Sequence, residues 1–185
     1  MPTSALTFRI FLSSPGDVPQ ERDDAQAVVN DINASREFED MFVKIELYRW
    51  EGHVPPSARQ SAQETVNKYS VLPSECDLVV VIFWTRLGTP TVVDNREYLS
   101  GTDYEYTHAL ESGKPEIFVY KCTQDDPISR TDPQRDEKNR QFDAVTQYIN
   151  KLKYEQKRLI GEYATHDDFK VEFKRDLLIH LRHIR

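Results

Sequence analysis

The stretch Asp77–Trp84, DLVVVIFW, carries the strongest strand signal in the chain. Its unbroken apolar and β-branched character is typical of a central parallel strand that is covered on both faces. The runs Phe8–Leu12 (FRIFL) and Glu116–Cys122 (EIFVYKC) also predict buried strands. In Val43–Trp50 (VKIELYRW), apolar residues alternate with charged ones, which indicates a strand nearer the edge of the sheet.

Segments with helical spacing separate these strands. The predicted helices run from Asp17 to about Arg36, from Pro55 to about Leu72, from Thr102 to the terminating glycine Gly113, from about Lys138 to Lys157, and from Thr165 onward, with a short strand at Leu159–Tyr163. Alternating strands and helices imply right-handed crossovers and a mostly parallel sheet. We therefore expect an α/β fold, a flavodoxin-like three-layer sandwich with strand order about 2-1-3-4-5.

Two loops leave the carboxyl ends of the first and third predicted strands, where flavodoxin-like folds bind their ligands. These loops are Ser13–Asp17 and Thr85–Gly101. The second is long for a compact domain, and loops of that length are usually functional or mobile. The polar stretch Thr123–Glu137 is expected to be a further exposed loop.

Length and charge limit the classes of function. The chain has 185 residues, which favours a single domain over residues 1–185. It carries 24 Lys and Arg against 31 Asp and Glu, a net charge of −7, which disfavours direct binding to nucleic acid or to anionic membranes. No apolar run reaches the roughly 18–20 residues of a membrane-spanning helix, and no signal peptide is visible, so we expect a cytoplasmic protein. Cys76 and Cys122 are expected to be buried free thiols.

The first loop, Ser13-Ser14-Pro15-Gly16-Asp17, places two hydroxyls and a glycine just before a predicted helix. Such a loop can hold the ribose or phosphate of a nucleotide, although it matches neither the Walker loop nor the dinucleotide fingerprint. The alternative is a capped turn, in which Ser14 and Asp17 accept hydrogen bonds from the first amides of the helix.

Glu105 lies near the start of the third predicted helix, beside the same edge of the sheet. The spacing Thr102-x-x-Glu105 fits a capping box, in which the carboxylate binds the backbone amide of Thr102. A carboxylate flanked by Tyr104 and Tyr106 could also stabilise an oxocarbenium-like transition state or attack an anomeric carbon. The two roles are not exclusive.

Three residues at the end of the central strand are further candidates. Arg86 and Gly88 follow the strand directly, and the guanidinium of Arg86 could pair with a phosphate or form a surface ion pair. Trp84 could stack on a base or pack into the core. The histidines and cysteines lack the spacing of a metal site, and no GxSxG motif occurs, so we predict neither a bound metal nor a serine nucleophile.

A series of short motifs, taken in order over about residues 7–122, supplies a resemblance. The motifs are Phe11-Leu12-Ser13-Ser14-Pro15-Gly16-Asp17-Val18 with Glu21-Arg22, Trp50 with Pro55, Cys76–Ile82, Arg86 with Gly88, and Glu105-Tyr106, Ala109 and Gly113-Lys114-Pro115. This set resembles a Toll/interleukin-1 receptor (TIR)-like family, catalogued mainly as a domain of unknown function and often N-terminal to NACHT or related STAND-type NTPase modules. The resemblance implies a TIR-like fold and an N-terminal effector module of a longer protein.

The segment from Gly101 to Pro115 is also similar to the nucleoside deoxyribosyltransferase pattern, whose matching glutamate attacks a sugar anomeric carbon. Enzymatic TIR domains use a glutamate to cleave the nicotinamide–ribose bond of NAD. By this resemblance Glu105 is the expected catalytic residue, with NAD as substrate and no separate cofactor. The expected substrate-binding residues are Ser13, Ser14, Asp17, Trp84, Arg86, Gly88 and Tyr104, of which Trp84 or Tyr104 would stack on the base.

The resemblance leaves three functions open. The first is an effector domain that hydrolyses NAD or a related nucleotide at the N-glycosidic bond in an immune or stress response, such as antiphage defence. The second is a non-catalytic module that self-associates for a STAND-type NTPase, with Thr85–Gly101 and Asp125–Glu137 as interface elements. The third is an enzyme like a deoxyribosyltransferase, with Glu105 as nucleophile. The expected partners are the nucleotide, further copies of the domain, and C-terminal NTPase or sensor domains.

Overall fold

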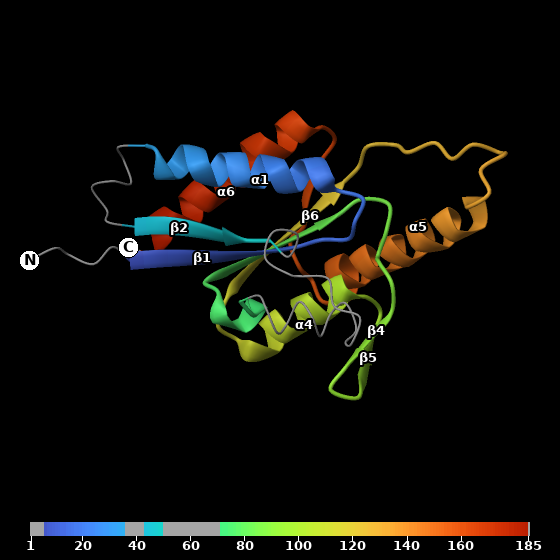
Figure 1. Ribbon diagram of the computed structural model, residues 1–185, viewed down its shortest axis with the longest axis horizontal. Coiled ribbons are helices and arrows are strands. Elements are labelled where there is room, and N and C mark those ends of the chain that lie inside the picture. Colours follow the sequence, from blue (N-terminus) through green and yellow to red (C-terminus); the bar gives the residue numbers. More distant parts are fainter. Residues whose placement is uncertain (1–5, 36–42, 50–70, 185) are drawn as a thin grey trace, which may run out of the picture.

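The computed structural model describes residues 6–35, 43–49 and 71–184. Trp50 and the helix predicted from Pro55 to about Leu72 lie outside the described residues, except for Val71 and Leu72, which are not helical. The described part forms an α/β fold with one main sheet between two layers of helices (Figure 1).

The main sheet has five strands, all parallel, in the order β2-β1-β3-β6-β7. The central strand β3 is buried along its whole length, as its apolar sequence predicts. The predicted order is confirmed, because the two strands omitted from this sheet form a separate hairpin. The bounds are β1 Leu6–Ser13, β2 Val43–Tyr48, β3 Leu78–Phe83, β6 Glu116–Cys122 and β7 Gly161–Tyr163.

Helices α1 and α6 pack together on one face of the sheet, and α4 and α5 cover the other face (Figure 1). The two-residue repeat of a strand divides the core between these faces. In β1, Ile10 and Leu12 join the cluster under α1 and α6, whereas Phe11 joins the cluster under α4 and α5. The helices span α1 Pro19–Asn33, α4 Gly101–Ser112, α5 Arg135–Asn150 and α6 His166–His183.

Helix α5 begins at Arg135, before the start predicted near Lys138. It continues as a short π-helical turn, Lys151–Glu155. The helical spacing of Phe142, Val145 and Ile149 predicts that all three are buried, but Phe142 is 49% exposed, so the prediction is wrong for this residue. The buried face begins one turn later, at Val145, because the first turns of α5 extend past the sheet.

The loop predicted over Thr85–Gly101 contains an antiparallel hairpin, β4 (Thr91–Val93) and β5 (Arg96–Tyr98). Asp94 and Asn95 make its turn, with φ angles of 51° and 62°. Positive φ at both central residues is the mark of a type I′ turn, and Asp and Asn tolerate it. The prediction of a loop without strands was therefore wrong for this segment.

Among the described residues, no helix is both long and apolar enough to cross a membrane. Cys76 and Cys122 are buried free thiols, as predicted. Burial raises the pKa of Cys122, and it raises the pKa of Cys76 to about 12. Both shifts favour the protonated thiol, which is less reactive than the thiolate.

Candidate functional site

The side chains of Ser13 and Glu105 meet at the carboxyl end of β1. Ser13 Oγ donates a hydrogen bond of 2.5 Å to Glu105 Oε2, and the two residues are 0% and 6% exposed. Ser13 is the last residue of β1, and the strand repeat turns its side chain toward α4 rather than α1. A carboxylate away from water needs such donors, because burying an unsatisfied charge is strongly unfavourable.

Glu105 does not cap its own helix. The N-cap of α4 is Ser100, whose Oγ accepts a 3.0 Å hydrogen bond from the amide of Asp103. Asp103 in turn accepts a hydrogen bond of 2.9 Å from the amide of Leu99. The capping box expected for Thr102 and Glu105 is wrong, because the helix already begins at Gly101 and its first turn is satisfied by Ser100.

The loop after β1 is not a capped turn either. Helix α1 begins at Pro19, and its N-cap residue, Val18, makes no side-chain cap. Ser14 Oγ instead accepts a 3.1 Å hydrogen bond from Arg22 Nη1. The interpretation of Ser14 and Asp17 as caps is therefore wrong: α1 begins at Pro19, so the N-cap position falls on Val18, and both Ser14 and Asp17 lie too early in the chain.

Asp17 ties the two predicted loops together. Its Oδ2 accepts hydrogen bonds from the amide of Thr85, at 2.8 Å, and from the Thr85 hydroxyl, at 3.0 Å. Thr85 follows the end of β3, so this contact fixes the loop after β1 against the loop after β3. The sequence places both residues at the same edge of the sheet, but it does not show that they bind each other.

The loop that carries Arg86 is fastened to α5. Gln141 Oε1 accepts hydrogen bonds from the amides of Leu87, at 3.2 Å, and Gly88, at 3.1 Å, while Gln141 Nε2 donates to the Gly88 carbonyl at 3.2 Å. Gly88 has a φ of +109°, and a Cβ there would lie 3.0 Å from the Cβ of Ser100. Gly88 is thus required by its backbone conformation and by the close approach of the α4 cap.

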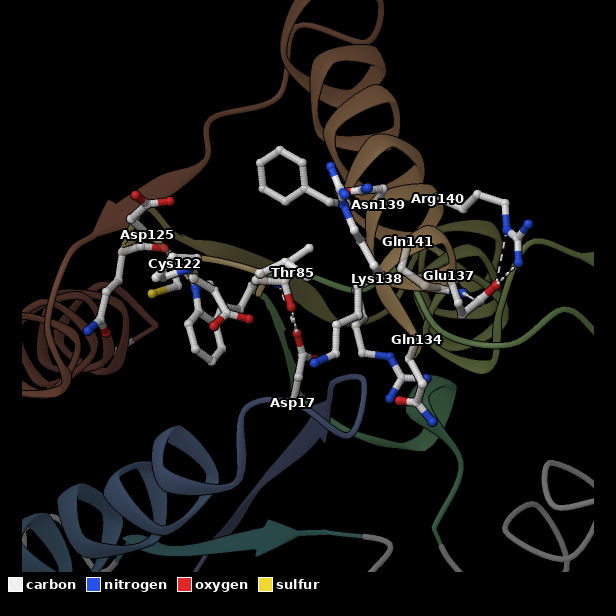
Figure 2. Close-up of a pocket in the computed structure, with 18 of the residues that line it drawn as sticks. Asp17, Thr85, Cys122, Asp125, Gln134, Glu137, Lys138, Asn139, Arg140 and Gln141 are labelled. Atoms are coloured by element: carbon white, nitrogen blue, oxygen red, sulfur yellow. Dashed lines mark hydrogen bonds and ion pairs between the residues drawn. The ribbon is translucent and has the colours of Figure 1, made fainter. Parts of the chain in front are cut away.

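A cavity of about 1180 Å³ opens beyond the carboxyl ends of β3 and β6 (Figure 2). Figure 2 shows the Asp17–Thr85 contact in its middle, with Cys122 and Asp125 on one side and Lys138 on the other. The walls come from Asp17, from Trp84–Arg86 after β3, from Lys121–Ile128 at the end of β6 and after it, and from Pro133–Phe142 at the start of α5.

The structure divides the predicted site residues into two groups and leaves some apart. Asp17, Trp84 and Arg86 line the cavity, while Ser13 and Glu105 form the buried pair outside its lining. Trp84 is half-buried, and its indole nitrogen donates a 2.9 Å hydrogen bond to the Gln124 carbonyl. The predicted residues outside both groups are Ser14, Gly88 and Tyr104.

Tyr104 is buried on the side of α4 that faces the hairpin. Its ring lies 5.1 Å from the ring of Tyr98 in an edge-to-face arrangement and 5.6 Å from the ring of His108. The contact with Tyr98 joins α4 to β5, and the contact with His108 lies within α4, so Tyr104 has a packing role in the described part of the structure.

Lys121 was missed by the sequence analysis and lies in the cavity wall. Its Nζ donates a 2.6 Å hydrogen bond to the Cys122 carbonyl. Burial lowers the pKa of Lys121, and the carboxylates of Asp17 and Glu162 oppose that shift. The available signal was a lysine near the carboxyl end of an otherwise apolar strand, the edge at which this fold class binds ligands.

No group of three or more His, Cys, Asp or Glu side chains within the described ranges is arranged to hold a metal ion. Comparison with curated proteins finds no match for this chain. The family described as "Domain of unknown function (DUF4062)" matches residues 9–178, which include most of β1, the central strand, Glu105 and the cavity walls. Since this match spans most of the sequence, the chain belongs to the DUF4062 family.

Proposed function

We propose that this domain is a TIR-like effector that hydrolyses NAD, or a related nucleotide, at the N-glycosidic bond, with Glu105 as the catalytic carboxylate. The observation that supports this most is the Ser13–Glu105 pair. Glu105 lies in the second turn of a helix whose cap is Ser100, and it is buried at the carboxyl edge of a parallel sheet, where this fold class performs its chemistry.

The chemistry requires one well-placed carboxylate. As the bond between ribose C1 and nicotinamide breaks, its electron pair leaves with the nicotinamide nitrogen and positive charge develops on the ribose. Glu105 would stabilise that charge or bond to C1, and water would then add to C1 with release of a proton. The hydroxyl of Ser13 donates a hydrogen bond to Glu105, which would hold the carboxyl group in place for either route.

The cavity supplies room for the rest of the substrate. Its volume of about 1180 Å³ slightly exceeds the roughly 300–1,000 Å³ of ligand pockets. Trp84 offers an aromatic surface for a base, and Arg86 offers a planar cation for a phosphate. The Asp17–Thr85 contact would hold these groups at a fixed distance from the strand that carries Ser13.

The biological setting belongs to the same proposal. By resemblance, the domain would act in the cytoplasm as the N-terminal effector of a longer protein, in an immune or stress response. Downstream NTPase or sensor domains would bring several copies together. This arrangement predicts that NAD cleavage depends on the association of several copies of the domain, so the test must compare separate and associated copies.

The proposal is tested by incubating the domain with NAD and following nicotinamide release, at low concentration and again when copies are joined to a multimeric carrier. Glu105→Gln keeps the shape of the side chain and removes its charge. We expect turnover to fall by about a hundredfold or more, the loss typical of removing an electrostatic stabiliser. Glu111→Gln, which changes an exposed carboxylate of the same helix, is the matched control. Equal turnover in Glu105→Gln and wild type would remove Glu105 from the catalytic role.

A non-catalytic homotypic module is the second candidate, because two observations favour it. The segment around the hairpin exposes apolar side chains, with Val92 at 52% and Leu99 at 56%. The cavity is lined by five acidic and five basic side chains, so its formal charge does not attract an anionic dinucleotide from a distance. Absence of nicotinamide release in every assembled state would favour this module, and exchange of the base on a deoxynucleoside would favour the transferase alternative.

A further inference from the structure

We propose that the cavity beyond β3 and β6 contains a phosphate subsite, in which Lys121 is the central cation and Arg86 and Arg135 lie beside it. This deepens the proposed function, because the subsite would hold the phosphates of the nucleotide. It rests on different residues from the catalytic pair, so it can be tested by binding alone.

Lys121 is placed by the sheet. In the pairing of β6 with β3, Lys121 lies opposite Phe83, the last residue of β3. Lys121 is therefore at the carboxyl edge of the sheet, next to the cavity. In the part of the chain that the structure describes, its ammonium has one hydrogen-bond acceptor, the Cys122 carbonyl. An ammonium group has three N–H donors, so two are available to a ligand.

The charge of Lys121 lacks a compensating carboxylate. No acidic oxygen among the described residues is within ion-pair distance of its Nζ, and Asp17 directs one carboxylate oxygen to Thr85. Burial accordingly lowers the pKa of Lys121, with the more distant Asp17 and Glu162 acting in the opposite direction. A phosphate oxygen at Nζ would supply the missing negative charge in a partly desolvated position, where such contacts are strongest.

Besides Lys121, four basic side chains line the cavity: two of them form ion pairs with carboxylates, and two form none within the described part of the chain. Lys138 and Arg140 already bind Asp132 and Glu137, at 2.6 Å and 2.7 Å. In the described residues Arg86 and Arg135 make no ion pair, and Arg135 is the first residue of α5, whose N-terminus has no side-chain cap. The Arg135 amide already donates to the Asp132 carbonyl at 3.1 Å, but the dipole of α5 also favours an anion at this end of the helix.

The acidic groups that face the cavity limit the affinity. Asp125, Asp126 and Asp136 are exposed, so water and salt screen their repulsion. Lys153 approaches the same end of β6 but binds Glu162. An anion would therefore be held by direct contacts to Lys121 and its neighbours rather than by the overall field, which gives a single substitution a large effect.

The test is a calorimetric titration of the domain with inorganic pyrophosphate, at low ionic strength and neutral pH. We expect Lys121→Met to weaken binding by about tenfold or more, as for the loss of a charged hydrogen-bonding partner, and Lys121→Arg to retain most of it. Lys174→Met, which changes an exposed lysine of α6, is the matched control and should bind as wild type does. Unchanged affinity in folded Lys121→Met, or no binding by wild type, would overturn the proposal.

A second measurement does not need the variant. Because a bound phosphate stabilises the ammonium form, it raises the lowered pKa of Lys121, and binding at alkaline pH should take up protons. Titrations in buffers with different ionisation enthalpies measure this uptake, and its absence counts against Lys121. Glu105→Gln should bind pyrophosphate normally, so loss of NAD cleavage with intact binding would separate failure of the proposed catalysis from failure of the subsite.

Discussion

The contact between Ser13 and Glu105 is a buried hydrogen bond that joins β1 to α4. A buried carboxylate loses its hydration, so each hydrogen bond it receives contributes more than at the surface. Replacing Ser13 by Ala takes away a donor at 2.5 Å and leaves the carboxylate where water does not reach. We expect the free energy of unfolding to fall by about 1–3 kcal/mol, measured by urea denaturation. Ser129→Ala, in an exposed loop, is the control, and equal stability of Ser13→Ala and wild type would contradict the importance of the contact.

Gly88 provides a test of backbone conformation. Gly88→Ala would place a Cβ at a φ of +109° and 3.0 Å from the Cβ of Ser100. We expect a loss of about 1–3 kcal/mol in the free energy of unfolding, together with weaker fastening of the Arg86 loop to Gln141. Gly16→Ala is the matched control, because nothing lies within 4 Å of its added Cβ and its φ is not positive. Similar stability of the two variants would show that the loop readily adopts another conformation.

Among the elements, the residue at which α4 begins matters most for the candidate site, because it fixes the direction in which the side chain of Glu105 points. Ser100→Ala removes the cap and should lower the free energy of unfolding by about 0.5–2 kcal/mol. Thr102→Val, which keeps the shape and removes the hydroxyl expected from the sequence to cap the helix, should have a smaller effect. Thermal denaturation of both variants shows which of the two hydroxyls caps α4. A larger loss in Thr102→Val would restore the capping box and take Glu105 away from its proposed role.

Several elements could be predicted from the sequence, and the failures have physical causes. The strand predicted at Glu116–Cys122 and the helix start predicted at Thr165, which is the N-cap of α6, are confirmed, because each depends on a local apolar or capping pattern. The β4–β5 hairpin was missed, although Asp94-Asn95 between a β-branched run and Arg96–Tyr98 is a turn signal. The start of α5 was placed too late because its first turns have no buried face, so the apolar repeat begins only inside the helix.

At the scale of the whole molecule, three buried tyrosines predict a loss of stability at alkaline pH. Burial raises the pKa of Tyr120, Tyr148 and Tyr163 above the ordinary value of 10.0. Above pH 10 the unfolded chain therefore releases these protons before the folded state does, and the free energy of unfolding falls as pH rises. Each tyrosine contributes a slope of up to about 1.4 kcal/mol per pH unit. Denaturation from pH 9 to 11 should show this fall, with a shallower slope for Tyr148→Phe. An identical slope in both proteins would contradict the assignment.

The sequence by itself determined the layers and the order of the parallel strands. Apolar periodicity is a local property, and short right-handed connections leave few arrangements for the strands that it identifies. It also indicated Glu105, Asp17 and Arg86 as side chains at the carboxyl edge of the sheet.

Only the tertiary structure decided what these side chains bind. Ser13 and Glu105 are 92 positions apart and Asp17 and Thr85 are 68 apart, so neither contact leaves a pattern within one segment. Within its own segment, Glu105 could bind the Thr102 amide in a capping box, and Asp17 could bind the first amides of α1. Local geometry could not decide between these nearby partners and the distant ones that the structure shows. The choice follows from where the packing of α4 and the sheet places each donor, because a buried carboxylate keeps the partner that replaces its lost water.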